Sequence, residues 1–206
     1  TLAVLRCSGH CLQPALMRLM KFPVGREGGL VSVDSTPHYH AVATTKGDVY
    51  SWGTPDSGRL GRDCCAEMDG SCLQPLEKPK VVEAMAAYKQ IEEVGPVIGV
   101  SCGARHMLCA TKKGRVFGWG DNRFLQVGVT ATDAAAAAKA LEGKKREMGE
   151  GGRRVLNLQH HSNSGEATRV LQLNAIACCG PVQLHFLVGI HIVMVACGSA
   201  HSLCLG

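Results

Sequence analysis

The chain has 206 residues, a hydrophobic fraction of 46% and a formal charge of +5. This hydrophobic content excludes disorder throughout, and a charge this small for the length gives no general attraction to nucleic acid. The 11 cysteines are odd in number and lie in a chain too long to need covalent stapling. We therefore expect a reducing compartment, cytoplasmic or nuclear, in which most thiols pack as small apolar groups.

The first predicted unit occupies about residues 14–61. Strands are expected over 41–44 and 49–52, because short runs of apolar and small residues flank Thr45-Lys-Gly47. Glycine adopts positive φ at no steric cost, so these three residues are expected to form the turn of a hairpin. After Trp52-Gly53 comes a polar loop, Thr54 to Gly58, which is suited to a tight reversal of the chain.

An irregular insert is expected over about residues 63–78, and a second unit over 79–128. This unit repeats the first one, with Trp119 in the place of Trp52 and Gly114 in the place of Gly47. Self-similarity of this kind indicates a repeat architecture, in which each unit needs neighbours to cover its apolar face. The expected elements of the second unit are strands over 97–102, 107–110 and 116–119, a turn at 112–114 and a polar loop at 121–124.

A longer insert is expected over about residues 130–165. Asp133 can cap a short helix over 134–142, which Gly143 would end. The basic arm that follows, residues 139–154, cannot bury a core and is expected to lie on the surface. It could touch chromatin, nucleic acid or an acidic partner, but a solvated loop is the preferred interpretation because no aromatic residue is interleaved for base stacking.

A third, shorter unit covers about residues 168–206. Its stretch Val195 to Cys204 reproduces Val100 to Cys109, so that Gly198 matches Gly103 and His201 matches His106. The same register places Thr36 and Tyr39 at these two positions in the first unit. Residues 182–197 form the most apolar stretch, but three polar residues interrupt it and it is too short for a membrane span. We expect buried sheet there and no membrane partner.

The shared pattern, Val-x-Cys-Gly-x-x-His-x-Leu followed by Gly-x-Val-x-x-Trp-Gly, resembles the repeat of the regulator of chromosome condensation family. The resemblance implies a seven-bladed β-propeller in which each repeat supplies about one four-stranded antiparallel blade. Residues 1–206 are therefore expected to be an all-β, partial propeller with an incomplete ring and two irregular inserts. In an incomplete ring the two terminal blades leave apolar faces exposed to water, and this withholds part of the hydrophobic stabilisation. We therefore expect the isolated piece to be marginally stable or to aggregate.

Enzymatic chemistry is not expected within this chain. A histidine that recurs in each unit, such as His106 and His201, is better explained as a buried hydrogen-bonding element than as a catalyst. No phosphate loop, hydrolase motif or pair of carboxylates occurs, so no cofactor is expected. Two cysteine-rich clusters lack Cys-x-x-Cys spacing and would need distant ligands, so packing is preferred to a zinc site. These clusters are Cys7, His10 and Cys11, and Cys64, Cys65 and Cys72.

Function is expected to lie in the loops that do not match between units. We predict a protein-binding module whose partner-binding residues are Asp56, Arg59, Asp121 and Arg123. The resemblance implies guanine-nucleotide exchange on a small GTPase, or scaffolding for one. The alternative is a partner-recruiting propeller segment of a large HECT-type ubiquitin ligase, whose catalytic cysteine would lie in a separate domain.

Overall fold

The structure is a computed structural model that describes residues 2–5, 17–20, 28–62, 76–129 and 177–206. Antiparallel strands dominate the described residues, as expected for an all-β chain. The first four-stranded sheet contains β3 (Leu30–Ser35), β4 (Tyr39–Thr44), β5 (Val49–Gly53) and β6 (Leu76–Val81). The second contains β7 (Val97–Cys102), β8 (His106–Thr111), β9 (Val116–Asp121) and β10 (Ala177–Gln183).

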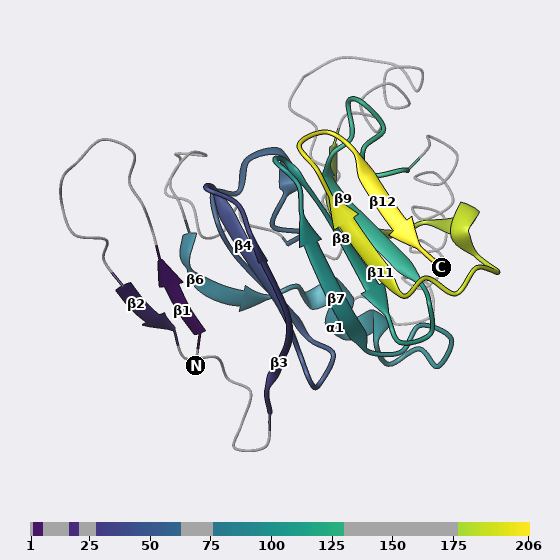
Figure 1. Ribbon diagram of the computed structural model, residues 1–206, viewed down its shortest axis with the longest axis horizontal. Coiled ribbons are helices and arrows are strands. Elements are labelled where there is room, and N and C mark those ends of the chain that lie inside the picture. Colours follow the sequence, from purple (N-terminus) through teal and green to yellow (C-terminus); the bar gives the residue numbers. More distant parts are fainter. Residues whose placement is uncertain (1, 6–16, 21–27, 63–75, 130–176) are drawn as a thin grey trace, which may run out of the picture.

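Two shorter strand pairs flank these sheets (Figure 1). One pair is β1 (Leu2–Leu5) and β2 (Met17–Met20), and the other is β11 (Met194–Cys197) and β12 (Ser202–Leu205). The remaining elements are a six-residue helix, α1 (Glu83–Tyr88), and two 3-10 turns, η1 (Asp56–Gly58) and η3 (His185–Leu187).

The hairpins form where the sequence predicts them. Gly47 and Gly114 occupy the β4–β5 and β8–β9 turns with φ of +78° and +76°. A Cβ on Gly47 would lie 2.7 Å from Cα of Pro96, so the turn also needs a residue without a side chain. The predicted turn geometry is therefore confirmed in both units.

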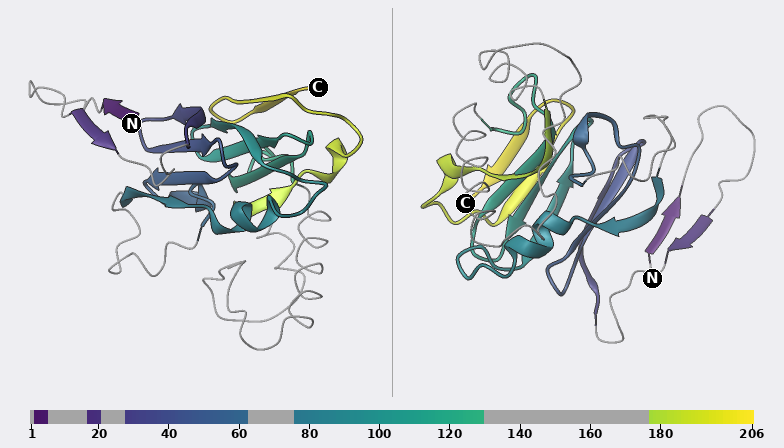
Figure 2. Two further views of the ribbon diagram at one scale, coloured as in Figure 1. Left: turned by 90° about the horizontal axis from the view of Figure 1, so that it is seen from below. Right: turned by 180° about the vertical axis from the view of Figure 1, so that it is seen from behind.

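The sheets stand side by side, each packing a face on the next (Figures 1 and 2). Strand β7 packs against β3 and β4, and β11 packs against β7 and β8. The core between them is apolar and fully buried, and its largest side chains are Trp119, Tyr39, Phe117, Leu60, Met85, Met107 and Leu108. One face of the first sheet is thus covered by the second sheet, and one face of the second sheet is covered by the β11–β12 pair.

The outermost strand of each sheet comes from a segment well separated along the chain from the other three strands. Strand β6 pairs with β5 and closes the first sheet, although it begins at Leu76, within the expected insert, and runs into the expected second unit. Strand β10 pairs with β9 in the same way, after residues 130–176. Sequence units and sheets are therefore out of phase by one strand. The helix expected over 134–142 and the basic arm lie outside the described residues.

The expectation of buried sheet over 182–197 is correct at the two ends of the stretch and wrong between them. Strand β10 ends at Gln183, η3 follows, and β11 begins only at Met194. Phe186 and Ile190, between the two strands, are 61% and 52% exposed. Apolar composition alone does not separate a strand from a connection that no neighbour covers. None of the helices in the described ranges is long and apolar enough to cross a membrane.

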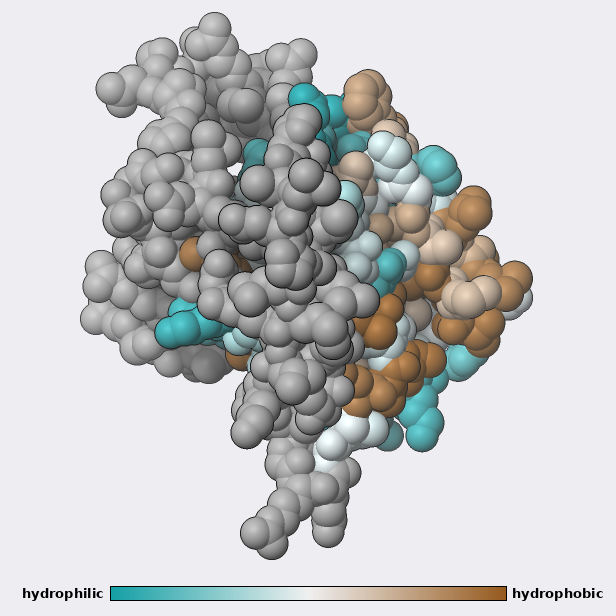
Figure 3. All heavy atoms as spheres, turned by 60° about the vertical axis from the view of Figure 1, so that its left-hand side comes forward, coloured by the Kyte–Doolittle hydropathy of each residue, from teal (hydrophilic) through white to brown (hydrophobic). Residues whose placement is uncertain are grey.

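Equivalent residues show which faces the described residues leave uncovered. Val33 is 54% exposed, whereas its counterparts Val100 and Val195 are 6% and 9% exposed because the preceding sheet covers them. Leu203 on β12 is 65% exposed, whereas its counterpart Leu108 on β8 is fully buried. Hydrophobic side chains consequently remain on the surface of the described part (Figure 3). The described sheets form a stack with two open faces and do not close a ring.

Candidate functional site

The histidine position of the repeat joins one sheet to the next. Tyr39, which holds that position in the first unit, donates its phenol hydrogen to the backbone oxygens of Gly103 and His106, at 2.9 and 2.5 Å. His106 in turn contacts Ser202 on β12, with 2.9 Å between Nε2 and Oγ. Tyr39 and His106 are fully buried. The interpretation of the motif histidine as a buried hydrogen-bonding element is therefore confirmed for His106.

The hydrogen-bond partners determine the protonation state of this histidine. The hydroxyl of Ser202 donates its single hydrogen to the backbone oxygen of Gln126, at 2.5 Å, so it must accept from Nε2 of His106. Nδ1 of His106 is buried and finds no partner among the described residues. Burial lowers the pKa of His106 and outweighs the backbone oxygen of His201, which acts in the opposite direction. These contacts and the lowered pKa favour the neutral ring with its hydrogen on Nε2.

A second set of contacts between sheets is made by the inner strands β3, β7 and β11, which lie at the edge of each sheet opposite β6 and β10. One carboxylate oxygen of Asp34 accepts the Cys102 amide at 2.8 Å and the Ser101 hydroxyl at 3.0 Å. The same Ser101 oxygen accepts the Cys197 amide at 3.0 Å. Asp34 and Ser101 occupy the same repeat position, and Ala196 follows them with no side-chain oxygen. These inner contacts fix the position of each sheet against the next, so the motif residues build the scaffold.

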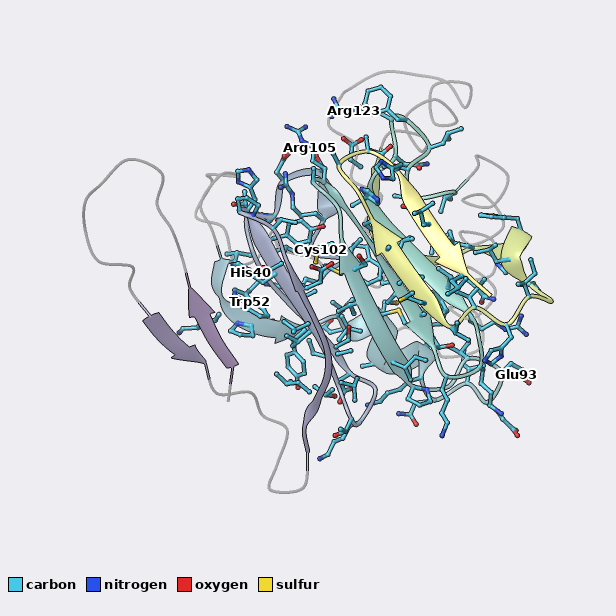
Figure 4. The ribbon with its side chains drawn as sticks, viewed as in Figure 1. His40, Trp52, Glu93, Cys102, Arg105 and Arg123 are labelled. Carbon is cyan, nitrogen blue, oxygen red and sulfur yellow. The ribbon has the colours of Figure 1, made fainter. Side chains whose placement is uncertain are left out.

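The four predicted partner-binding residues meet at one end of the two sheets. Asp56 and Arg59 lie in the loop after β5, Asp121 ends β9, and Arg123 follows it. Figure 4 shows Arg123 at this end, near Arg105 from the β7–β8 turn. The structure therefore gathers charged side chains from three loops of two sheets at one end, which we call the arginine end.

Arg59 is part of the scaffold at this end. Its guanidinium forms an ion pair with Asp56, donates to the Asp56 backbone oxygen at 2.7 Å and reaches the backbone oxygen of Ala104 at 3.3 Å. It also lies over the Tyr39 ring, 5.6 Å from the centroid, and its side chain is only 4% exposed. Arg59 thus ties the β5 loop to the second sheet and presents little surface to a partner.

Asp121 and Arg123 form a second ion pair with one buried and one exposed member. The side chain of Asp121 is 3% exposed, and that of Arg123 is 49% exposed. Nε of Arg123 lies 3.0 Å from each carboxylate oxygen, and Nη2 lies 2.6 Å from Oδ2. Burial acts to raise the pKa of Asp121, but hydrogen bonds from Arg123 outweigh it and hold that pKa below its usual range. About half of the Arg123 side chain remains exposed to solvent.

Arg105 is a member of the arginine end that the sequence analysis missed. Its side chain is 49% exposed, and its Nη2 lies 4.0 Å from Oδ2 of Asp56. Its backbone oxygen accepts the Asp121 amide at 2.8 Å, which fixes the turn beside the β9 loop. The sequence could have indicated Arg105 by its place between the motif residues Gly103 and His106. The turn that these residues form lies at the same end of the sheets as the predicted loops.

Buried side-chain amides hold the β9 loop from inside. Asn122 accepts the Val127 amide at 3.1 Å and donates to the Val129 backbone oxygen at 2.8 Å. Gln126 accepts the Phe124 amide at 2.8 Å. Asn122 and Gln126 are 1% and 5% exposed, so the loop backbone is fixed although its tip faces solvent.

The described residues contain no group of three or more His, Cys, Asp or Glu side chains that could hold a metal ion. Both cysteine clusters considered in the sequence analysis lie outside the described residues.

Family models match two overlapping parts of the chain. Both describe the regulator of chromosome condensation (RCC1) repeat, and they match residues 46–110 and 97–126. Residues 46–126 of this chain therefore match the repeat of that family. The residues matched run from the turn at Gly47 through β5 to β9 and include the motif histidine His106.

The curated relatives that this chain matches are much longer than the chain. The E3 ubiquitin-protein ligase HERC2 of Homo sapiens is 24% identical over 85% of this chain, which spans 4% of that ligase. The Protein RCC2 homolog of Danio rerio is 31% identical over 49% of the chain and 18% of that protein.

Solved structures show the same fold. Human WBSCR16 superposes with a TM-score of 0.57 at 18% identity, over 92% of this chain and 35% of that one. Prp20p of Saccharomyces cerevisiae, described with its binding to Gsp1p and histones, gives 0.54 at 14% identity, over 92% and 33%. The predicted β-propeller fold, with an incomplete ring in this chain, is confirmed.

Proposed function

We propose that this chain is a protein-binding part of a β-propeller and that it contacts its partner through the arginine end. The observation that carries the proposal is the gathering there of Asp56, Arg105 and Arg123, whose exposed charges lie on loops that differ between units. Arg59 and Asp121, the other predicted residues, support these three from inside. Loops on a rigid scaffold are where binding residues concentrate.

The partner that the resemblance favours is a small GTPase. Prp20p, which shares the fold, binds Gsp1p and histones. We propose exchange or scaffolding: contacts at the arginine end would stabilise the nucleotide-free form of the GTPase and shift its population toward release. No bond is broken in that process, so no catalytic group is required of the propeller. A cytoplasmic or nuclear location fits such a partner.

A nucleotide-release assay tests this function. Full-length protein that contains this segment is mixed with a panel of small GTPases loaded with mantGDP, and release is followed by fluorescence. We expect the protein to accelerate mantGDP release from one GTPase of the panel. The variant Arg105→Glu should abolish this acceleration. The matched control is Lys112→Glu, a charge reversal in the β8–β9 turn at the other end of the sheet. No acceleration of any GTPase by the wild-type protein would exclude exchange.

The second candidate is partner recruitment within a large ubiquitin ligase. It is favoured by the match to HERC2, which extends over 85% of this chain. In that case the propeller would select a substrate or regulator, and ubiquitin transfer would occur in a separate domain. The full reading frame discriminates: a chain with a C-terminal HECT domain favours the ligase, and a chain of about one propeller favours the exchanger.

Contact with chromatin or nucleic acid through residues 139–154 is the weakest proposal. Salt dependence tests it, because binding through phosphate contacts weakens steeply as salt rises. Neutralising Lys144, Lys145 and Arg146 should reduce that dependence. Binding that keeps its salt dependence after their neutralisation excludes the arm as the contact.

A further inference from the structure

The tip of the β9 loop exposes two large apolar side chains beside Arg123. Phe124 is 73% exposed and Leu125 is 60% exposed. Phe186 of η3, 61% exposed, lies 3.3 Å from where a Cβ on Gly128 would be, where the same loop runs back along the sheet and away from its tip. Apolar surface therefore borders the positive charge of the arginine end.

The fold does not require these side chains. The corresponding loop after β5 carries Ser57 and Gly58 at the two positions. Gly58 has φ of +71°, and Leu125 keeps a left-handed backbone at φ +58°, which a leucine rarely adopts. Each residue makes the same turn, since the Gly58 amide bonds Pro55 and the Leu125 amide bonds Asn122. The second unit thus holds an exposed leucine where glycine would fit better.

The loop is also prepared for binding. Its backbone is fixed by the buried amides of Asn122 and Gln126, so docking against Phe124 and Leu125 would order little additional chain. Rigid apolar groups displayed in this way bind at low entropic cost. Unusual backbone conformations that the surrounding structure enforces are concentrated at binding sites.

We propose that the Arg123-Phe124-Leu125 tip, with Arg105, is a receptor for an acidic segment of a partner protein that carries an apolar anchor residue. The anchor would pack on Phe124 and Leu125, and a carboxylate would bind the half-exposed side chains of Arg123 and Arg105. This inference rests on the proposed function as a protein-binding module and names the chemistry of the partner.

The test uses a random 12-residue peptide library displayed on phage and selected on the full chain. Enriched peptides are expected to carry Asp or Glu beside Leu, Phe or Trp. Their affinities are then measured by fluorescence anisotropy for wild type and for the double variant F124S/L125G, which restores the residues of the first unit. We expect about a tenfold loss for the double variant and about a threefold loss, dependent on salt, for Arg105→Glu.

Two controls separate binding from folding. Leu125→Gly alone removes the side chain from the strained backbone position. This variant is expected to keep the fold and to lower the affinity for the peptide severalfold. Val31→Ser, which removes an apolar side chain exposed on β3, should leave affinity unchanged. Thermal melts of each variant show whether a loss of binding reflects a loss of structure.

Several results would overturn the inference. Enrichment of basic or uncharged peptides, equal binding by F124S/L125G, or displacement of the peptide by single-stranded oligo-dT would each do so. These results leave the GTPase assay untouched, because that assay reads nucleotide release by the whole protein. Failure of the peptide test and failure of the proposed function are therefore distinguishable.

Discussion

Replacing Gly103 with alanine tests why the repeat requires a glycine three residues before its histidine. A Cβ at Gly103 would fall onto Cε1 and Nδ1 of His106 and would lie 2.7 Å from the backbone oxygen of Gly198. The ring cannot move away, because it is fully buried and bonded to Ser202. The first unit avoids the conflict by changing both residues, to Thr36 and Tyr39.

Overpacking a rigid core site by one methyl group typically costs about 1–3 kcal/mol. For a chain of this size, that loss lowers the midpoint of thermal unfolding by about 2–12 °C. Urea denaturation of Gly103→Ala should show the loss, with Gly99→Ala in the preceding strand β7 as the control, since a Cβ at Gly99 meets no atom within 4 Å. Equal stability of the two variants would refute the steric explanation of the motif.

Three further predictions follow from single contacts. Ser101→Ala leaves the Cys197 amide without its acceptor and should lower the free energy of unfolding by about 1–3 kcal/mol in urea titrations. Leu125→Gly should raise it by up to about 1 kcal/mol, because the left-handed cost of leucine exceeds the entropy cost of glycine, whereas Leu125→Ala should show no gain. Burial lowers the pKa of His106 in the folded protein below its unfolded value of about 6.5. The free energy of unfolding should therefore be greatest above the unfolded pKa and should decrease as pH falls through the folded pKa, because the unfolded chain then binds the proton more readily. His106→Gln should remove that part of the pH dependence between pH 8 and 5, and an unchanged profile would contradict it.

The hairpins and the scaffold role of the motif were predictable from the sequence. A turn such as that at Gly47 is encoded locally, by one glycine between two short apolar runs. The recurrence of His106 in successive units likewise indicated a structural role, because a catalyst is not repeated at each equivalent position. These inferences needed only local spacing and comparison between units.

Other features depend on contacts that composition does not contain. Strand β6 closes its sheet from a segment well separated along the chain, so its pairing with β5 is a long-range choice. Helix α1 has six residues, too few for a periodic pattern, and its one buried side chain is Met85. Arg59 and Asp121 are polar residues in variable loops, and only the structure shows that each is almost fully buried against a partner.

The acceptors on the inner strands give the stack a direction. The Asp34 carboxylate accepts the Cys102 amide, and the Ser101 hydroxyl oxygen accepts the Cys197 amide. In each case the acceptor precedes its donor along the chain, whereas Ala196, at the same repeat position, has no side-chain oxygen that could accept such a bond. Stability in such an array is a sum of nearest-neighbour terms, so opening of one sheet is felt mainly by the next. Amide hydrogens of β12 should therefore exchange with solvent well before those of β8, which has neighbours on both sides.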